Sequence, residues 1–482
     1  MRPLCSQLTF ADVEMQRMLA LDPVLQAVTD LLDQHAELVQ LVHSDLQRGL
    51  KNPQLGRTGI SPSQVLRSLV LMRIKNWDYR ELRERIHDGI TLRTFTAFDS
   101  NPVPKHDAFN RAFNRITPET MEAINLGVIQ AAVDLGLEDG KNLRVATVVE
   151  TNVHYPTDAT LLWDCVRTLH RLMKQMKKQA DGLPRFPGRT RCARRRMQQI
   201  QRMTAQQRAT QQKPKYRELI EVTEEVAGNA GSTVKAARKM LARKKAPLPV
   251  EVAAALGELC QQIEHYVELT GQVIGQSRRR VLEGEEVPTE EKLFSIFEPH
   301  TDLIKRGKAQ KPVEFGHKVF LAESGKGLIT GYRVLEGNPA DSTQVQASLD
   351  QHEKIFKSAP QCYASDRGFH SAGNIVACQE AGVVDICIPQ RGGGKSDEQA
   401  ALEKTATFRQ GQRFRAGIEG RISVLFRGRG MKRCLWKGQV RFEVLVGACV
   451  LANNLLRIAQ LLSDDKASKK PSRKAAPNKR AA

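Results

Sequence analysis

Apolar residues recur at helical spacing through much of the first 138 residues, and this pattern predicts a helical N-terminal segment. The clearest helix start is residues 61–64, Ser-Pro-Ser-Gln. The serine can cap a helix, the proline fits the first helical position, and the glutamine can complete a capping box. Gly89 offers a stop, and a second helix is expected over residues 107–113. Several short basic helices fit a helix-turn-helix unit that binds DNA, but any all-helical domain has the same pattern.

Strand patterns follow this segment. Residues 143–149 are rich in β-branched side chains and predict a strand. Helical patterning returns from about residue 161 to 282, and the sheet then resumes with an expected hairpin over residues 313–335. A short strand, a helix and another strand are expected over residues 361–389. They form a βαβ unit, so its two strands should be parallel.

A hairpin joined to a parallel βαβ unit is the strand plan of a ribonuclease-H-like fold. We therefore predict an α/β fold class, with a ribonuclease-H-like mixed sheet core interrupted by a helical insertion and preceded by a helical N-terminal domain. The expected parts are a helical DNA-binding domain at 1–138, the core at 139–158 and 313–462, a basic helical insertion at 159–312, and a disordered basic tail at 463–482.

Charge points to a polyanionic partner. Lys and Arg outnumber Asp and Glu by 74 to 53, which gives a formal net charge of +21. Between Arg171 and Lys215 there are fourteen Lys or Arg and one acid, and Arg194, Arg195 and Arg196 lie inside this stretch. A solvated helix face usually mixes both signs, so this bias favours nucleic acid over a merely soluble basic surface.

The sequence also predicts a location. The first residues lead into an acid-containing stretch and not into the apolar core of a signal peptide. We expect no apolar run of the roughly 18–20 residues that span a bilayer, and so no membrane association. The nine cysteines include no CxxC pair, which favours a reducing compartment over a disulfide framework or a zinc ribbon. These features predict a cytoplasmic protein that is associated with the nucleoid when it binds DNA.

Two acids are candidates for metal-dependent chemistry. Asp366 ends a short buried-looking strand and precedes Arg367-Gly368, at a strand end where α/β proteins place ligands. Equally, it could cap the next helix. Glu419 is the lone acid in a basic segment, where a carboxylate is either ion-paired or a metal ligand close to phosphate. Basic residues continue the segment, namely Arg421, Arg427, Arg429, Lys432 and Arg433.

The motifs, taken in order, resemble those of bacterial insertion-sequence transposases of the DDE type, close to the ISNCY family. The resemblance covers nearly the whole chain. Its segments are Val65–Leu71, Tyr79–Leu82, Glu150–Asp164, Phe315–Lys318, Ser365–Phe369, Gly417–Arg421 and Ala452–Leu455. The resemblance implies that Asp366 and Glu419 are the second and third acids of the catalytic triad. It also implies Mg²⁺ or Mn²⁺ as the cofactor, phosphodiester cleavage followed by strand transfer, and terminal inverted repeats and target DNA as double-stranded partners. A homo-oligomer on DNA is expected as well.

One motif departs from the family. Relatives have the first acid on the initial strand, in Asp-Ser/Thr-Thr, but this chain has Arg144-Val145-Ala146-Thr147 there. Glu150, Asp158 and Asp164 are the nearest acids, and Asp158 is the candidate substitute. The alternatives are therefore a cleaving transposase, a catalytically impaired relic that only binds DNA, and a structure-specific nuclease that shares the core.

Overall fold

The computed structural model describes residues 21–52, 55, 58–150, 156–243, 248–299, 301–305, 313–392, 394–432, 434 and 436–468. The chain divides into two compact units. We call them the core unit, Met1–Asn152 with His317–Ala482, and the insertion unit, Val153–Gly316. The insertion unit interrupts the core unit in sequence.

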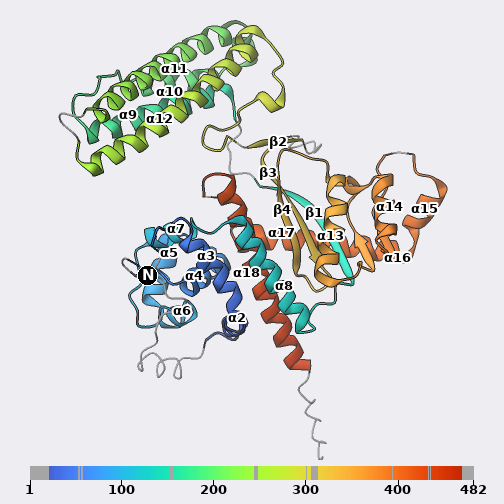
Figure 1. The fold of residues 1–482 in the computed structure, drawn as a ribbon. Coiled ribbons are helices and arrows are strands. Elements are labelled where there is room, and N and C mark those ends of the chain that lie inside the picture. Colours follow the sequence, from blue (N-terminus) through green and yellow to red (C-terminus); the bar gives the residue numbers. More distant parts are fainter. Residues whose placement is uncertain are drawn as a thin grey trace, which may run out of the picture. The chain divides into compact units, whose positions relative to one another are not determined.

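The N-terminal part of the core unit is helical, as predicted (Figure 1). Its helices are α2 (Pro23–Gln34), α3 (Ala36–Gln47), α4 (Pro62–Lys75), α5 (Tyr79–Asp88), α6 (Ile90–Phe95), α7 (His106–Phe113) and α8 (Pro118–Asp134). The capping box is confirmed, because Ser61 Oγ accepts from the Gln64 N–H and Gln64 Oε1 accepts from the Ser61 N–H. α4 ends before the predicted stop at Gly89, since Asn76 adopts a left-handed conformation with φ of 55°.

A mixed sheet follows, and it makes the fold class α/β. Its strands are β1 (Asn142–Glu150), β3 (Val313–Ser324), β4 (Ile329–Leu335), β5 (Cys362–Ala364) and β6 (Asp385–Cys387). β1 lies between β3 and β5, β4 pairs with β3, and β6 pairs with β5. The β3–β4 hairpin and the parallel β5–β6 pair are both confirmed. A further strand that we did not predict, β2 (Asp302–Lys305), pairs with the first residues of β3.

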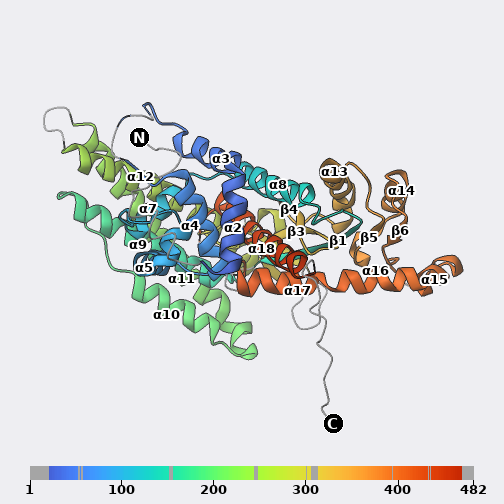
Figure 2. The same cartoon turned by 90° about the horizontal axis from the view of Figure 1, so that it is seen from below.

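Helices cover both faces of the sheet (Figure 2). On one face, Val145 and Phe320 pack against α13 (Val345–Phe356) and α14 (Ala372–Glu380). On the other face, Ala146 and Val319 pack against α17 (Ile418–Ser423) and α18 (Gln439–Ser468). Two further helices, α15 (Asp397–Lys404) and α16 (Ala406–Ala416), precede α17. Side chains alternate along each strand, so neighbouring residues of β1 enter different cores.

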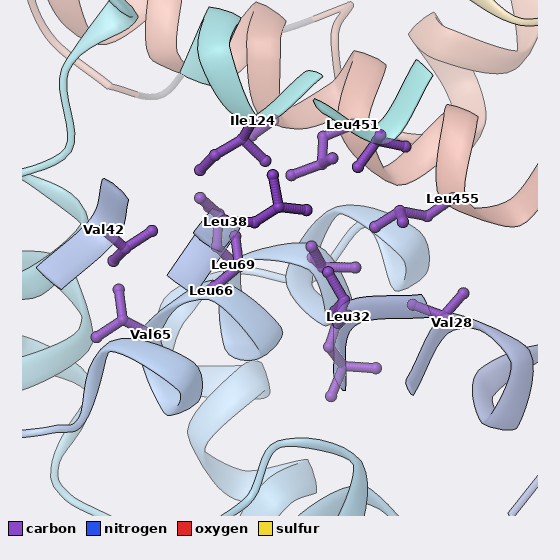
Figure 3. Packing of buried hydrophobic residues seen from close by; sticks show 14 of the residues in the cluster. Val28, Leu32, Leu38, Val42, Val65, Leu66, Leu69, Ile124, Leu451 and Leu455 are labelled. Atoms are coloured by element: carbon purple, nitrogen blue, oxygen red, sulfur yellow. The ribbon is translucent and has the colours of Figure 1, made fainter. Parts of the chain in front are cut away.

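α18 lies at the centre of the core unit. Its Leu451 and Leu455 are fully buried in one cluster with Leu66 of α4 and Ile124 of α8 (Figure 3). The stretch Gln439–Asp465 is long and apolar enough to cross a membrane by length and composition, but 78% of its most apolar window is buried inside the protein. The expectation that no apolar run reaches this length was therefore wrong, and the helix continues to Ser468, into the predicted tail.

The insertion unit is mainly helical, as the sequence predicted. Its helices are α9 (Asp158–Gln179), α10 (Thr190–Gln201), α11 (Ala205–Leu241) and α12 (Val250–Ser277), followed by a π-helical turn at Arg278–Glu283. α9 packs against α10, α11 and α12 around one apolar core. The unit buries its own hydrophobic side chains and exposes most of its basic ones.

Candidate active site

Asp366 lies just beyond β5, near the level of β1 at which the sequence analysis expected a further acid. β1 and β5 run parallel, and their register pairs Arg144 with Ala364. If the register is continued by two residues, Ala146 is level with Asp366. Ala146 is 2% exposed and belongs to the same apolar cluster as Ile418, the residue before Glu419. At this level of β1 the chain thus carries a buried methyl group and no carboxylate.

Asp366 and Glu419 are brought together by one arginine. Arg415 Nη2 donates to Asp366 Oδ2 at 3.2 Å and to Glu419 Oε1 at 3.5 Å. The two carboxylate oxygens are therefore within about 7 Å of each other, although 52 residues lie between them in sequence. The Asp366 side chain is 38% exposed and that of Glu419 is 63% exposed, so solvent and ions reach both.

Asp366 also has the capping role that the sequence left open. Its Oδ1 accepts from the Gly368 N–H at 2.8 Å and caps the short turn Arg367–Phe369. The following helix, α14, is capped by Ser371 instead. One carboxylate oxygen thus orients the side chain, and the other points to Arg415.

A third carboxylate, Asp341, lies beside this pair and was missed from the sequence. A Cβ on Gly368 would be 2.9 Å from Asp341 Oδ2 and 2.9 Å from Asp366 Oδ1, so the lack of a side chain keeps the space between the two acids open. Asp341 Oδ1 accepts from Thr147 Oγ1 at 2.9 Å and contacts Lys318 Nζ at 2.7 Å. β4 runs in the same direction as β1 and β5, so an acid soon after β4 reaches the same sheet edge. That topology is the signal that could have found Asp341.

A buried ion network fixes the corner between α16 and α17. Glu323 is 0% exposed. Its Oε2 accepts from Arg144 at 2.8 Å and its Oε1 accepts from Arg421 at 2.8 Å. Arg144 Nη1 also donates to Phe414 O, and it lies 2.2 Å from where a Cβ on Gly417 would be. The network therefore positions the start of α17, which carries Glu419, and it pairs Glu323 with Arg421, whose side chain is 21% exposed.

The other basic residues that were predicted to bind DNA differ in their exposure and in their contacts. Arg194, Arg195, Arg427 and Lys432 are exposed. Arg196 is ion-paired with Glu218. Arg429 is half-buried and donates to Ile74 O at 2.8 Å, and burial lowers the pKa of its guanidinium below the ordinary value. Arg433 lies outside the described residues.

Asp158, the candidate substitute acid, belongs to the insertion unit. It begins α9, and its side chain is 7% exposed. Its carboxylate accepts from Gln276 Nε2 at 3.1 Å and from Arg280 Nη1 at 2.8 Å. These contacts hold the α9 start against α12 and the π-helical turn. The catalytic role of Asp158 stays a prediction, and the Glu150 side chain lies outside what the structure describes.

The carboxylates suit a hard divalent cation in kind, because their oxygens are the ligands that Mg²⁺ prefers. Gly368 leaves room between two of them. Two features oppose a complete site. Arg415 lies between Asp366 and Glu419, and no group of three or more His, Cys, Asp or Glu in the described part of the chain is placed to hold a metal ion. The carboxylates therefore suit such an ion in kind, but no set of three among the described residues is placed to hold it.

Fold and site thus define a mixed α/β protein with an acidic pair at the carboxyl edge of its parallel strands. Residues 16–115 match a known family, described as a transposase domain (DUF772). The match covers the N-terminal helices through α7 and supports a transposase. No curated protein and no solved structure was found to match the chain.

Proposed function

We propose that this chain is an insertion-sequence transposase of the DDE type, related to the ISNCY family, with a ribonuclease-H-like core. The strand order supports such a core. β4 and β3 form a hairpin, β3 pairs antiparallel with β1, β1 pairs parallel with β5, and β5 pairs parallel with β6. The transposase match at residues 16–115 supports the class independently of the sheet. Together they favour DNA transposition over the structure-specific nuclease considered above.

The single observation that carries the proposal is the meeting of Asp366 and Glu419 on Arg415. In this proposal the two carboxylates hold Mg²⁺ or Mn²⁺ at the end of the element. When bound, such ions activate the attacking hydroxyl and stabilise the leaving oxygen. The Gly368 N–H fixes the Asp366 side chain, and the Glu323 network fixes the helix that carries Glu419. Arg415 keeps the acidic pair together by offsetting the repulsion between the two carboxylates.

A second candidate function is favoured by Ala146. Position 146 of β1 carries no acid. The ions that Asp366 and Glu419 would hold therefore lack a further carboxylate ligand from this strand. A chain of this kind binds the element ends and cleaves them slowly or not at all. In both functions the partners are terminal repeats and target DNA, the protein acts as a homo-oligomer on DNA, and it is cytoplasmic and nucleoid-associated.

Cation binding tests the acidic pair directly. Mn²⁺ titrated into the full chain and followed by electron paramagnetic resonance should bind, and Asp366→Asn should weaken that binding by at least about 10-fold, because a ligating charge is lost. Asp397→Asn is the matched control, since Asp397 is exposed at the start of α15. Equal Mn²⁺ binding by the protein, Asp366→Asn and Glu419→Gln would remove the acidic pair from the proposal.

The basic insertion is proposed to bind DNA through exposed arginines. Each phosphate contact contributes close to one unit to the slope of log affinity against log salt. Replacing Arg194, Arg195 and Arg196 together by alanine should therefore reduce this slope by about two, because Arg196 is bound to Glu218. Arg196→Ala alone should leave the slope nearly unchanged. An unaltered slope in the triple variant would exclude this face of α10 from DNA binding.

A further inference from the structure

Helix α7 (His106–Phe113) has one buried face and one polar face open to solvent. Phe109 and Phe113 are 0% exposed, whereas Asn110 and Arg111 are exposed. Asn114, which ends the helix, is exposed too, and its Nδ2 donates to Asn110 Oδ1 at 3.0 Å. Arginine pairs with guanine and asparagine with adenine in the major groove. The open face thus carries side chains of the types that read base edges.

The buried face holds α7 firmly on its neighbours. The Phe113 ring lies 5.8 Å from Tyr79 of α5 and 6.1 Å from Phe109 (centroid to centroid). Phe98, in the loop before the helix, lies 5.9 Å from Phe109 in an edge-to-face arrangement. Packed aromatic rings of this kind fix orientation as well as burying area. α7 therefore presents its polar face from a rigid support, as a reading helix must.

Positive charge gathers at the C-terminal end of α7. Arg48 Nη2 donates to Arg115 O at 2.7 Å, and Arg115 donates back to Arg48 O. Arg441 Nη1 donates to Phe113 O at 3.0 Å. Asp45, 3.6 Å from Arg48, is the carboxylate paired with this group. The helix dipole favours cations at this end, but three guanidinium groups beside one carboxylate leave a surplus positive charge that fits a polyanion.

Arg115 also has an unused donor. Its Nε is buried and has no hydrogen-bond partner among the described residues. A buried donor without an acceptor costs free energy, and because this Nε is closed to solvent, an incoming acceptor reaches it only when the Arg115 side chain turns outward. Phosphate oxygens supply both that acceptor and the negative charge.

We propose that α7 reads base edges in the major groove of double-stranded DNA at the element end. Asn110, Arg111 and Asn114 contact the bases, and Arg48 and Arg115 bind the neighbouring phosphates. The inference rests on the proposed function and adds the element that selects the sequence. α7 lies within residues 16–115, the part of the chain that matches the transposase domain.

The test measures the affinity of the full chain for two duplexes by fluorescence anisotropy at several salt concentrations. One duplex carries the inverted repeat that flanks the gene encoding this chain, and the other has the same composition in scrambled order. Arg111→Ala and Asn114→Ala should weaken binding to the repeat by about 10- to 100-fold and leave the scrambled duplex within about twofold. Arg115→Gln should weaken both duplexes alike and lower the salt slope by about one. Lys354→Ala is the charge control, because Lys354 is exposed on α13.

The outcomes separate this inference from the function on which it rests. If the unaltered chain prefers the repeat and the α7 variants keep that preference, the base-reading element is elsewhere and the inference fails while the proposed function stands. If the unaltered chain binds both duplexes equally, the proposed function fails and the inference with it. Thermal unfolding of each variant separates lost contacts from lost folding. A specific loss in folded α7 variants supports the inference.

Discussion

Glu323→Ala should lower the free energy of unfolding of the core unit by about 3–5 kcal/mol, because it leaves two arginines in low-dielectric surroundings without their carboxylate. The side chains of Arg144 and Arg421 are only 13% and 21% exposed, and both donate to Glu323. Removing one partner of a buried ion network costs more than the network's own net contribution, since the remaining charges stay desolvated.

Urea unfolding measures this effect. Trp77 and Trp436 report on the core unit, and a Trp163→Phe background removes the signal of the insertion unit. Glu380→Ala is the control, because Glu380 is exposed at the end of α14 and should change stability by less than about 0.5 kcal/mol. A loss below about 1 kcal/mol in Glu323→Ala would mean that the network does not hold the α16–α17 corner.

Local signals in the sequence predicted local structure well. The Ser61–Gln64 capping box, the β3–β4 hairpin and the parallel β5–β6 pair depend on residues close together in the chain, and each is confirmed. Helix ends that depend on the backbone conformation of a single residue were harder to predict. Asn76 ends α4 by adopting a left-handed conformation, and the sequence marked the glycine further on as the more obvious stop.

Features that depend on distant contacts were missed. Asp341 follows β4 in sequence, but only the strand directions bring it beside Asp366. The contact of Arg421 with Glu323, which is 98 residues away in the chain, could not be derived from the sequence either, and the predicted contact of Arg421 with DNA stays a prediction. α18 is apolar enough to suggest a membrane span, and the core formed by α2, α4 and α8 accounts for that composition instead.

Of the candidate site residues, Asp366 and Glu419 could be selected from sequence because each is an acid in a distinctive setting. Their closeness could not be derived, since it depends on α16 placing Arg415 between them. The contacts of Asp158 with Gln276 and Arg280 likewise required the folded insertion unit. Sequence thus supplied the chemistry of the side chains, and the fold supplied their partners.

Placing an acid at position 146 is the second change with a large expected effect. If the β1–β5 register is continued by two residues, Ala146 is level with Asp366, and in the proposed site a carboxylate there would join Asp366 and Glu419. Ala146→Asp should raise the rate of Mg²⁺-dependent cleavage by about 100-fold or more over the unaltered chain. Loss of a residue that only supports a metal ligand costs about 10- to 100-fold in metal affinity or activity, and a residue that binds the metal directly should matter at least as much. Ala146→Asn has the same shape without the charge and should not raise the rate.

Mg²⁺-dependent cleavage of the terminal repeats tests the proposed DDE site most directly, measured for the chain, for Ala146→Asp, and for Ala146→Asp combined with Asp366→Asn. We expect all three proteins to bind the repeat. The unaltered chain should cleave it slowly or not at all, Ala146→Asp should cleave it clearly, and the double variant should lose that cleavage. Cleavage that survives Asp366→Asn, or a folded, repeat-binding Ala146→Asp protein that does not cleave, would contradict the assignment of Asp366 and Glu419 to a DDE site.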